Sequence, residues 1–416
     1  MGVAHVLPRT LSSLEEATFA DTTADFDAAG QEFYGFECDL SGVAQAKIEN
    51  QNYNDNPWKY HQTIRALKSA STVTWAEYLT ASGTHAAEGA DAAATQLSMH
   101  MRAAWGGRSL NRSAGTVSSS TNTVDVDAAE GANYAEGDLI YISDADGSGQ
   151  WYIVQSISTD TLTLDRDLHF SAGASDTVKA TIQCYPDWIP LTDHSDAAHT
   201  TMALAVKGVD SEDYWELFGI KPSIEMDEIT QGTAPVLRFT GNIVDFRHET
   251  LTADALAGAP EGQAPLAIGT ADSCKFFLGL KSGPLTAVDA SSIQPRFGIT
   301  HVADGGPNGR EGVHGWVAQG FDAAGLDVTA RFDDDFATDF RADGIYHALI
   351  QIGDGAEDSV AIYFPYLEFS AEPVRAGSDN IYSQLSFRAM QNKATTALTG
   401  ADLRRWIAPF HVGVVA

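Results

Sequence analysis

The chain has 416 residues, of which 44% are hydrophobic, so it can bury a substantial core and is not a disordered protein. Its 56 acidic and 25 basic residues give a formal net charge of −31. That charge repels a phosphate backbone and argues against a protein that grips nucleic acid from outside. It suits a surface past which DNA slides without sticking, and equally an abundant protein that acidity keeps soluble.

The cysteines and the amino terminus bear on where the protein is made. Three cysteines, Cys38, Cys184 and Cys274, are far apart and odd in number, which disfavours a disulfide framework. The chain does not start with a basic stretch followed by an apolar core, and no run of residues approaches the length of a membrane span. We therefore expect synthesis in a cytoplasm and no membrane anchor.

Residues 1–112 are predicted to form an amino-terminal arm and the first part of a main domain. Residues 1–30 mix short apolar patches with polar residues. This mixture is typical of a terminal arm that becomes ordered only on contact with a neighbouring subunit. Strands are expected in Glu32–Val43 and Tyr60–Leu79. One flanking helix is expected over Ala92–Trp105, because this stretch is rich in alanine and its large apolar residues recur every four positions.

Residues 113–185 are predicted to form a small all-β domain inserted into the main one. Within 113–183, 11 acidic residues face 2 basic ones, a net charge of −9. Four β-rich runs are separated by turn signals such as DADGSG, which is typical of a meander of antiparallel strands. These runs are Thr123–Val126, Leu139–Ile142, Trp151–Ile157 and Thr161–Leu164.

Residues 186–416 return to the main domain and begin with its most regular stretch, 201–246. Leu237, Phe239 and Ile243 alternate with polar residues, the period expected when one face of a sheet is buried. Glu212–Phe218 is predicted to be a helical turn, capped by Asp210 or Ser211 and ended by Gly219. Later in the chain, Val313–Phe321 and Leu326–Phe332 are predicted to form a hairpin.

Motifs for chemistry are weak. Asp144 and Asp146 are the first acids of a calcium-type loop that lacks its twelfth-position glutamate, so a hairpin turn is preferred. Acidic residues 333–335 with Asp339 are interpreted as a solvated loop. His194 and His199 lack the spacing of a zinc motif. We therefore predict no catalytic residues, no metal and no cofactor, although a pair of carboxylates for glycoside chemistry stays open.

The order of residues in Val206–Phe246 (VKG…YWELFGIKPSIEMDE…APVLRFTGNIVDF) resembles the middle of major tail tube proteins of long-tailed, siphovirus-like bacteriophages. Tyr363–Pro373 and Ile381–Ala389 fit the same family, and Glu32–Leu79 fits it more weakly. The resemblance implies tail-tube-type modules of the β-sandwich or barrel kind and no enzymatic activity. It also implies a virion component that assembles into stacked rings and contacts other phage tail proteins, with DNA passing through an acidic lumen without specific binding.

In that family, a long loop reaches the adjacent ring. Here the loop corresponds to the Ala/Gly/Pro-rich segment 251–267. Its candidate inter-ring residues are Leu251, Asp254, Pro260, Glu261, Gln263 and Pro265. The residues that face DNA are left open.

A faint internal duplication matches Glu32–Leu40 and Tyr60–Leu67 with Cys274–Leu280 and Arg296–Val302. If the duplication is real, three chains would make a ring of six modules, which we favour; otherwise six chains are needed. Three alternatives remain: an extracellular or capsid-decorating module that binds through 113–183, a carbohydrate-active enzyme, and a tail terminator or adaptor ring.

Overall fold

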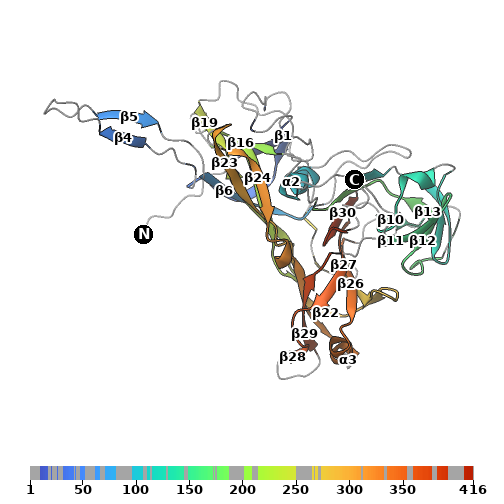
Figure 1. Cartoon of the computed structure of the whole chain (residues 1–416). Coiled ribbons are helices and arrows are strands. Elements are labelled where there is room, and N and C mark those ends of the chain that lie inside the picture. The colour runs from blue at the N-terminus through green and yellow to red at the C-terminus, as the bar shows by residue number, and fades with distance from the viewer. Residues whose placement is uncertain are drawn as a thin grey trace.

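Antiparallel strands dominate the computed structural model of the chain (Figure 1), which confirms the prediction of a mainly β protein. Most of these strands belong to two large sheets and one small closed barrel. The structure describes residues 10–16, 20, 26, 31–41, 43, 47–51, 61–65, 71–80, 96–105, 110–112, 115–127, 130–144, 149–171, 173, 176–186, 201–208, 214–249, 265–266, 268–269, 273–310, 313–331, 335–353, 359–376, 382–391 and 407–415.

The first sheet, which we call the first module, has the strand order β2-β1-β15-β16-β18-β6-β3, and β19 pairs with part of β16. Only Tyr34 separates β2 from β3, and these two strands pair with opposite ends of the sheet, β1 and β6. They therefore act as one bent strand that nearly closes the module. Its strands are β1 (Thr10–Glu15), β2 (Gln31–Phe33), β3 (Gly35–Asp39), β6 (Ser71–Tyr78), β15 (Met202–Lys207), β16 (Tyr214–Met226), β18 (Val236–Ile243) and β19 (Asp245–Glu249).

The second module has the order β22-β25-β29-β27-β26-β20-β21, and β30 pairs with part of β27. Its strands are β20 (Cys274–Leu280), β21 (Thr286–Ala287), β22 (Ala290–Arg296), β25 (Gly325–Arg331), β26 (Ile345–Ile352), β27 (Val360–Phe369), β29 (Tyr382–Ala389) and β30 (His411–Val415). Short strands extend this sheet at its margins: β7 (Leu110–Arg112), β14 (Thr181–Cys184), β17 (Ile229–Thr230) and β28 (Val374–Ala376).

The two modules share one topology. Each strand of the first module has a counterpart at the same place in the chain order and in the sheet of the second. The counterparts are β1 and β20, β2–β3 and β21–β22, β6 and β25, β15 and β26, β16 and β27, β18 and β29, and β19 and β30. The matched strand pairs are antiparallel in both modules. The irregularities match too, because the register shifts in the pairs β15–β16 and β26–β27, and again in β3–β6 and β22–β25. In this match, Cys274–Leu280 corresponds to β1 rather than to Glu32–Leu40.

Each module also carries a hairpin and a helix at the same point of the chain. The hairpin β4 (Lys47–Gln51) and β5 (His61–Arg65) lies between β3 and β6, and β23 (Thr300–Arg310) with β24 (Val313–Gln319) lies between β22 and β25. The helix α2 (Gln96–Trp105) follows β6, and α3 (Asp335–Arg341) follows β25. Figure 1 shows β4–β5 projecting far from both sheets, whereas β23–β24 runs alongside the first module.

Two sequence predictions are corrected here. The predicted hairpin of Val313–Phe321 with Leu326–Phe332 is wrong, because β24 pairs with β23 while β25 pairs with β22 and β29. The 3-10 turn Phe321–Ala323 separates the two strands, which belong to different layers. Strand patterning gives the strands but not their partners, so two neighbouring strands in sequence looked like a hairpin.

The predicted helical turn Glu212–Phe218 is also wrong. Residues from Tyr214 onward form β16, and Asp210 and Ser211 lie outside the described residues. Leu217 belongs to the main core, while Tyr214 and Phe218 pack in a separate cluster on the other face. Because both faces are buried, the strand loses the alternation that would have revealed it. Gly219 does not end an element but lies within β16, with a φ of 68°.

The remaining predictions for the two modules fare better. In β18, Leu237, Phe239 and Ile243 are buried as expected, and Trp75 of the neighbouring β6 stacks on Phe239 with ring centroids 5.0 Å apart. The predicted helix is confirmed over its described part as α2, whose residues Leu97, Met101 and Trp105 are core residues. The helix α3 was not predicted, because its acidic start was interpreted as a loop.

The barrel closes in the order β10-β11-β12-β9-β8-β13, and four of its strands, β9 to β12, were predicted. Its strands are β8 (Gly115–Ser120), β9 (Thr123–Asp125), β10 (Leu139–Ser143), β11 (Gly149–Ser158), β12 (Thr161–Leu164) and β13 (Asp176–Val178), with a 3-10 turn at Glu130–Asn133. In sequence the barrel interrupts the first module, but its flanking strands, β7 and β14, pair with each other, and β14 pairs with β30 of the second module. The boundaries 113 and 185 stay predictions.

The barrel packs tightly on the second module. Ile140 and Ile142 point into the barrel core, whereas Leu139 and Tyr141 belong to a cluster shared with the second module. This double burial explains why every residue of β10 is buried. At the same contact, the Trp151 indole donates to Ser359 Oγ at 2.9 Å. Figure 1 accordingly shows the barrel beside β30.

Candidate functional site

Only one of the six predicted inter-ring residues can be placed. Pro265 is exposed, just before Leu266, whose backbone N–H donates to the carbonyl of Leu79 at 2.9 Å. The other five, Leu251, Asp254, Pro260, Glu261 and Gln263, lie outside the described residues, so the inter-ring role of this segment stays a prediction.

The two modules contact each other through a strand that one adds to the sheet of the other. β17, which lies in the connection between β16 and β18 of the first module, pairs with β22 of the second: Ile229 lies opposite Ile293, and Thr230 opposite Ser292. Ile229 and Ile293 also lie in the one hydrophobic core that runs through both modules. The first module thus adds a strand to the sheet of the second.

The β23–β24 hairpin of the second module reaches back in return. The Trp316 indole of β24 donates to the carbonyl of Gly219 in β16 at 2.9 Å and packs on Val244. Asn242 of β18 donates to the carbonyl of His301 in β23 at 3.0 Å. We call this two-way contact, a strand added in one direction and a hairpin laid back in the other, the module joint.

Among the described residues, the matching parts of the first module differ in their strand pairing. β3 pairs on one side with β6, and no other strand pairs with it among the described residues, although β22, its counterpart, has β17 as a second neighbour. Three aromatic residues lie in or next to β3. Tyr34 is 66% exposed and Tyr78 is 40% exposed, and Phe36 of β3 packs on Tyr78 with ring centroids 4.8 Å apart. Exposed aromatic residues on the last strand of a sheet are typical of an interface.

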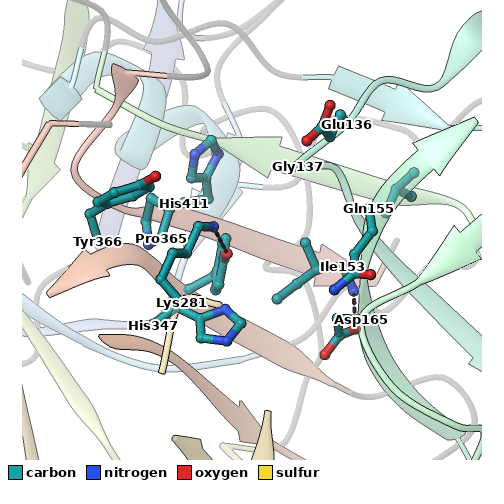
Figure 2. Close-up of a pocket in the computed structure, with 12 residues that line it drawn as sticks. Glu136, Gly137, Ile153, Gln155, Asp165, Lys281, His347, Pro365, Tyr366 and His411 are labelled. Carbon is teal, nitrogen blue, oxygen red and sulfur yellow. Dashed lines mark hydrogen bonds between the residues drawn. The ribbon is translucent and has the colours of Figure 1, made fainter. Parts of the chain in front are cut away.

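A cavity of about 430 Å³ lies where the barrel meets the second module (Figure 2). Lys281 crosses it: its ammonium group donates to the Tyr363 hydroxyl at 3.5 Å and lies 5.0 Å from the centre of the Tyr366 ring. Burial lowers the pKa of Lys281, and Glu136 on the barrel side opposes that shift. The lining residues are Glu136, Gly137, Ile153, Val154, Gln155, Asp165, Lys281, His347, Tyr363, Pro365, Tyr366 and His411.

His347 is a buried polar group that lines this cavity. Burial, helped by the charge of Lys281, lowers its pKa to about 4, so the imidazole is neutral at pH 7. Its Nε2 lies 3.2 Å from the carbonyl of Gly283 and must carry the proton to bond there, which leaves Nδ1 as an acceptor. That Nδ1 atom is buried and has no hydrogen-bond partner among the described residues. The cavity can therefore accept a small donor such as a hydroxyl group, with Lys281 available for an anionic group.

A buried cluster in the first module has the distances of a catalytic triad. Ser13 Oγ lies 2.8 Å from His100 Nε2, and His100 Nδ1 lies 2.7 Å from Glu77 Oε1. Trp75 also donates to Glu77 at 2.6 Å, and Ser13 to Gln96 at 2.7 Å. However, Ser13 and His100 are fully buried and Glu77 is 6% exposed, so no substrate can reach the serine. We interpret the cluster as a polar network that fixes α2 on the sheet.

The weak metal motifs gain no support. In the part of the chain that the structure describes, no three histidine, cysteine, aspartate or glutamate side chains are grouped to hold a metal ion. Asp339 instead accepts a hydrogen bond from Tyr346. Asp146, His194 and His199 lie outside the described residues.

Comparison with known proteins adds no identity. No family model matches the chain, and no curated protein matches it. Among the described residues, no helix is long and apolar enough to cross a membrane. The functional argument therefore rests on the repeated module, the module joint and the cavity. Sequence reasoning missed the joint and the cavity, because each assembles residues from distant parts of the chain.

Proposed function

We propose that the chain is a structural subunit that assembles into rings and stacked tubes, as the major tail tube protein of a long-tailed bacteriophage does. The observation that carries the proposal is the repeated module with its joint: each module offers one surface that receives a neighbour and one that reaches a neighbour. Inside one chain, only one such joint can form. Copies of the chain are needed to use the remaining surfaces, and three chains would supply a ring of six modules.

The net charge supports a conduit. A wall with the chain's excess of 56 acidic over 25 basic residues repels phosphates, so DNA would stay hydrated and pass without contacts that release counterions. In this proposal the barrel decorates the outside, and the protein is a virion component that also meets other tail proteins. In this proposal the protein has no enzymatic role.

Negative-stain microscopy and mass measurement of the purified chain test the proposal. We expect rings of three chains, stacked into filaments of uniform width with an axial hole. Rings that do not stack would favour a terminator or adaptor. Particles without a bore, or a bore lined by lysine and arginine, would refute the conduit.

The cavity supports a second candidate function, the binding of a small polar ligand at the base of the barrel. The Nδ1 atom of His347, which has no partner among the described residues, and the ammonium group of Lys281 together suit a hydroxylated molecule with an anionic group, such as an acidic sugar. Binding of acidic saccharides to the intact chain, lost in a Lys281→Ala variant, would support this function. If the chain binds none of them, or if the variant binds equally well, this candidate fails.

A further inference from the structure

A second cavity, of about 830 Å³, lies where three parts of the chain meet: β17, the strands β20 to β22 of the second module, and the barrel. The lining residues that carry the argument are Arg166, His169, Lys275, Phe276, Phe277 and Leu285. We propose that this second cavity binds a small aromatic carboxylate, with its ring system on the apolar wall and its carboxylate at Lys275. The proposal goes beyond the tube function and does not depend on it. The second cavity also shares none of its described lining residues with the cavity of Figure 2.

One wall of the second cavity is apolar. Phe276, Phe277 and Leu285 line it, and each is less than a tenth exposed. Ile229 and Ile293, which lie opposite each other in the pair of β17 and β22, line it too. Ligand sites are typically cavities of roughly 300–1,000 Å³ with mostly apolar and aromatic walls and a few polar groups that fix the orientation of the ligand. Because aromatic side chains pack well against a second flat ring, this wall favours a ligand with an aromatic body.

Lys275 supplies a positive charge to the second cavity. The residue is half-buried, and its ammonium group has no hydrogen bond or ion pair among the described residues. Acidic residues outnumber basic ones by 56 to 25 in this chain, so a cation without an acidic partner is unexpected. Two carboxylates also line the cavity, but Asp289 pairs with Arg331 at 3.6 Å, and Asp167 is exposed to solvent. A ligand with an anionic group would give Lys275 a charge-assisted hydrogen bond.

His169 supplies a second hydrogen-bond donor. Partial desolvation, and next the charge of Lys275, lower the pKa of His169 to about 4, so the imidazole is neutral at pH 7. The Tyr152 hydroxyl accepts the backbone N–H of His169 at 3.0 Å and lies 2.9 Å from its Nδ1, but 3.5 Å from Gln150 Oε1. The hydroxyl therefore donates its proton to Nδ1, which leaves the ring proton on Nε2. One carboxylate oxygen of the ligand can then accept from Lys275 and the other from His169 Nε2–H.

Arg166 holds the barrel side of the second cavity in place. Its guanidinium group donates to the Asp165 carboxylate and to the carbonyl of Trp151, both in the barrel. The same group lies 4.2 Å from the centre of the Phe277 ring in the second module. These contacts join the two walls in the absence of a ligand. A site that is already formed loses less free energy to ordering when its ligand binds.

Isothermal titration calorimetry of the full chain with 2-naphthoate tests the site, and neutral 2-naphthamide is the matched ligand. We expect the chain to bind naphthoate, and to bind the amide about tenfold more weakly. Lys275→Gln should raise the Kd for naphthoate about tenfold and leave the Kd for the amide unchanged, because only the carboxylate bonds to the ammonium group. Lys207→Gln removes the same charge from β15 and should change neither value. Lys281→Ala, in the other cavity, should also have no effect on naphthoate binding.

Filling the second cavity supplies a readout that removes no charge. Ala287 is exposed and lines the cavity, so Ala287→Trp should occupy the place of the naphthyl ring and abolish binding. Thr286→Trp, at the exposed neighbouring position outside the lining, is the matched control, and circular dichroism checks the fold of each variant.

Cys274 gives a third readout, because it lines the second cavity. Bound naphthoate should slow the alkylation of Cys274 by iodoacetamide but not that of Cys38, which is also half-buried and lies on β3. If the parent chain does not bind naphthoate, or if either Lys275→Gln or Ala287→Trp leaves binding unchanged, the proposal is overturned while the tube proposal stands. A chain that binds naphthoate as expected but forms no rings or tubes would do the reverse.

Discussion

The chain should lose stability on mild acidification through His347. Because burial lowers the pKa of this imidazole in the folded protein to about 4, while an unfolded histidine titrates near its model value of 6.5, the unfolded chain binds the extra proton between these pH values. Stability therefore rises with pH across this window, and protonation opposes folding. The stabilising contribution is complete above about pH 6.5 and falls progressively toward pH 4.

The two pKa values set the size of the effect. At pH 5, nearly all unfolded molecules are protonated at this site and few folded ones are, which corresponds to about 2 kcal/mol relative to pH 7.5, rising to about 3 kcal/mol at pH 4. A His347→Gln variant keeps a polar side chain without this titration. We expect its loss of stability between pH 7.5 and pH 5 to be smaller than that of the parent chain by about 2 kcal/mol.

Denaturant unfolding, followed by tryptophan fluorescence at both pH values, measures this difference. Trp151 lies at the same contact between the barrel and the second module and reports on it. His314→Gln, at an exposed position of β24, is the matched control and should keep the parent's dependence on pH. Equal pH dependence of the His347→Gln variant and the parent would refute the reasoning.

Three further predictions concern stability. Glu77→Leu should cost about 1–3 kcal/mol, because it leaves the buried Trp75 indole without its acceptor, and the melting temperature should fall accordingly. Trp151→Ala should cost about 3–5 kcal/mol of the barrel's packing, seen as faster proteolysis between barrel and second module. Gly219→Ala should destabilise by more than about 1 kcal/mol in thermal denaturation, because φ is 68° and the new Cβ would lie 2.7 Å from a methyl group of Val244. A neutral outcome in any of these three would contradict the packing described.

The sequence was most informative where one face of an element is buried. The alternation in β18 and the four-residue spacing in α2 predicted both elements, because each has a core side and a polar side. It failed at β16, where clusters on both faces bury Leu217 and Phe218 alike. Turn signals likewise located the barrel strands, although they could not show that β8 and β13 close the circle.

The hydrophobic pattern of the sequence could not predict which strands pair with each other. The faint duplication seen in the sequence aligned Cys274–Leu280 with the wrong strand, because the repeat survives in connectivity and bulges rather than in residues. The cavity was equally hidden. Lys281 and His347 are unremarkable in sequence and gain their properties only when the barrel covers them.

The surface on which the barrel packs has an evolutionary consequence. The barrel is spliced into the first half of the chain, yet β14 and the Trp151 contact hold it on the second half. This contact needs both halves, and the present chain supplies them in one polypeptide. A barrel acquired after the two halves were fused would have found this surface within its own chain, and relatives that lack the barrel but retain the doubled core would be the expected intermediates of that history.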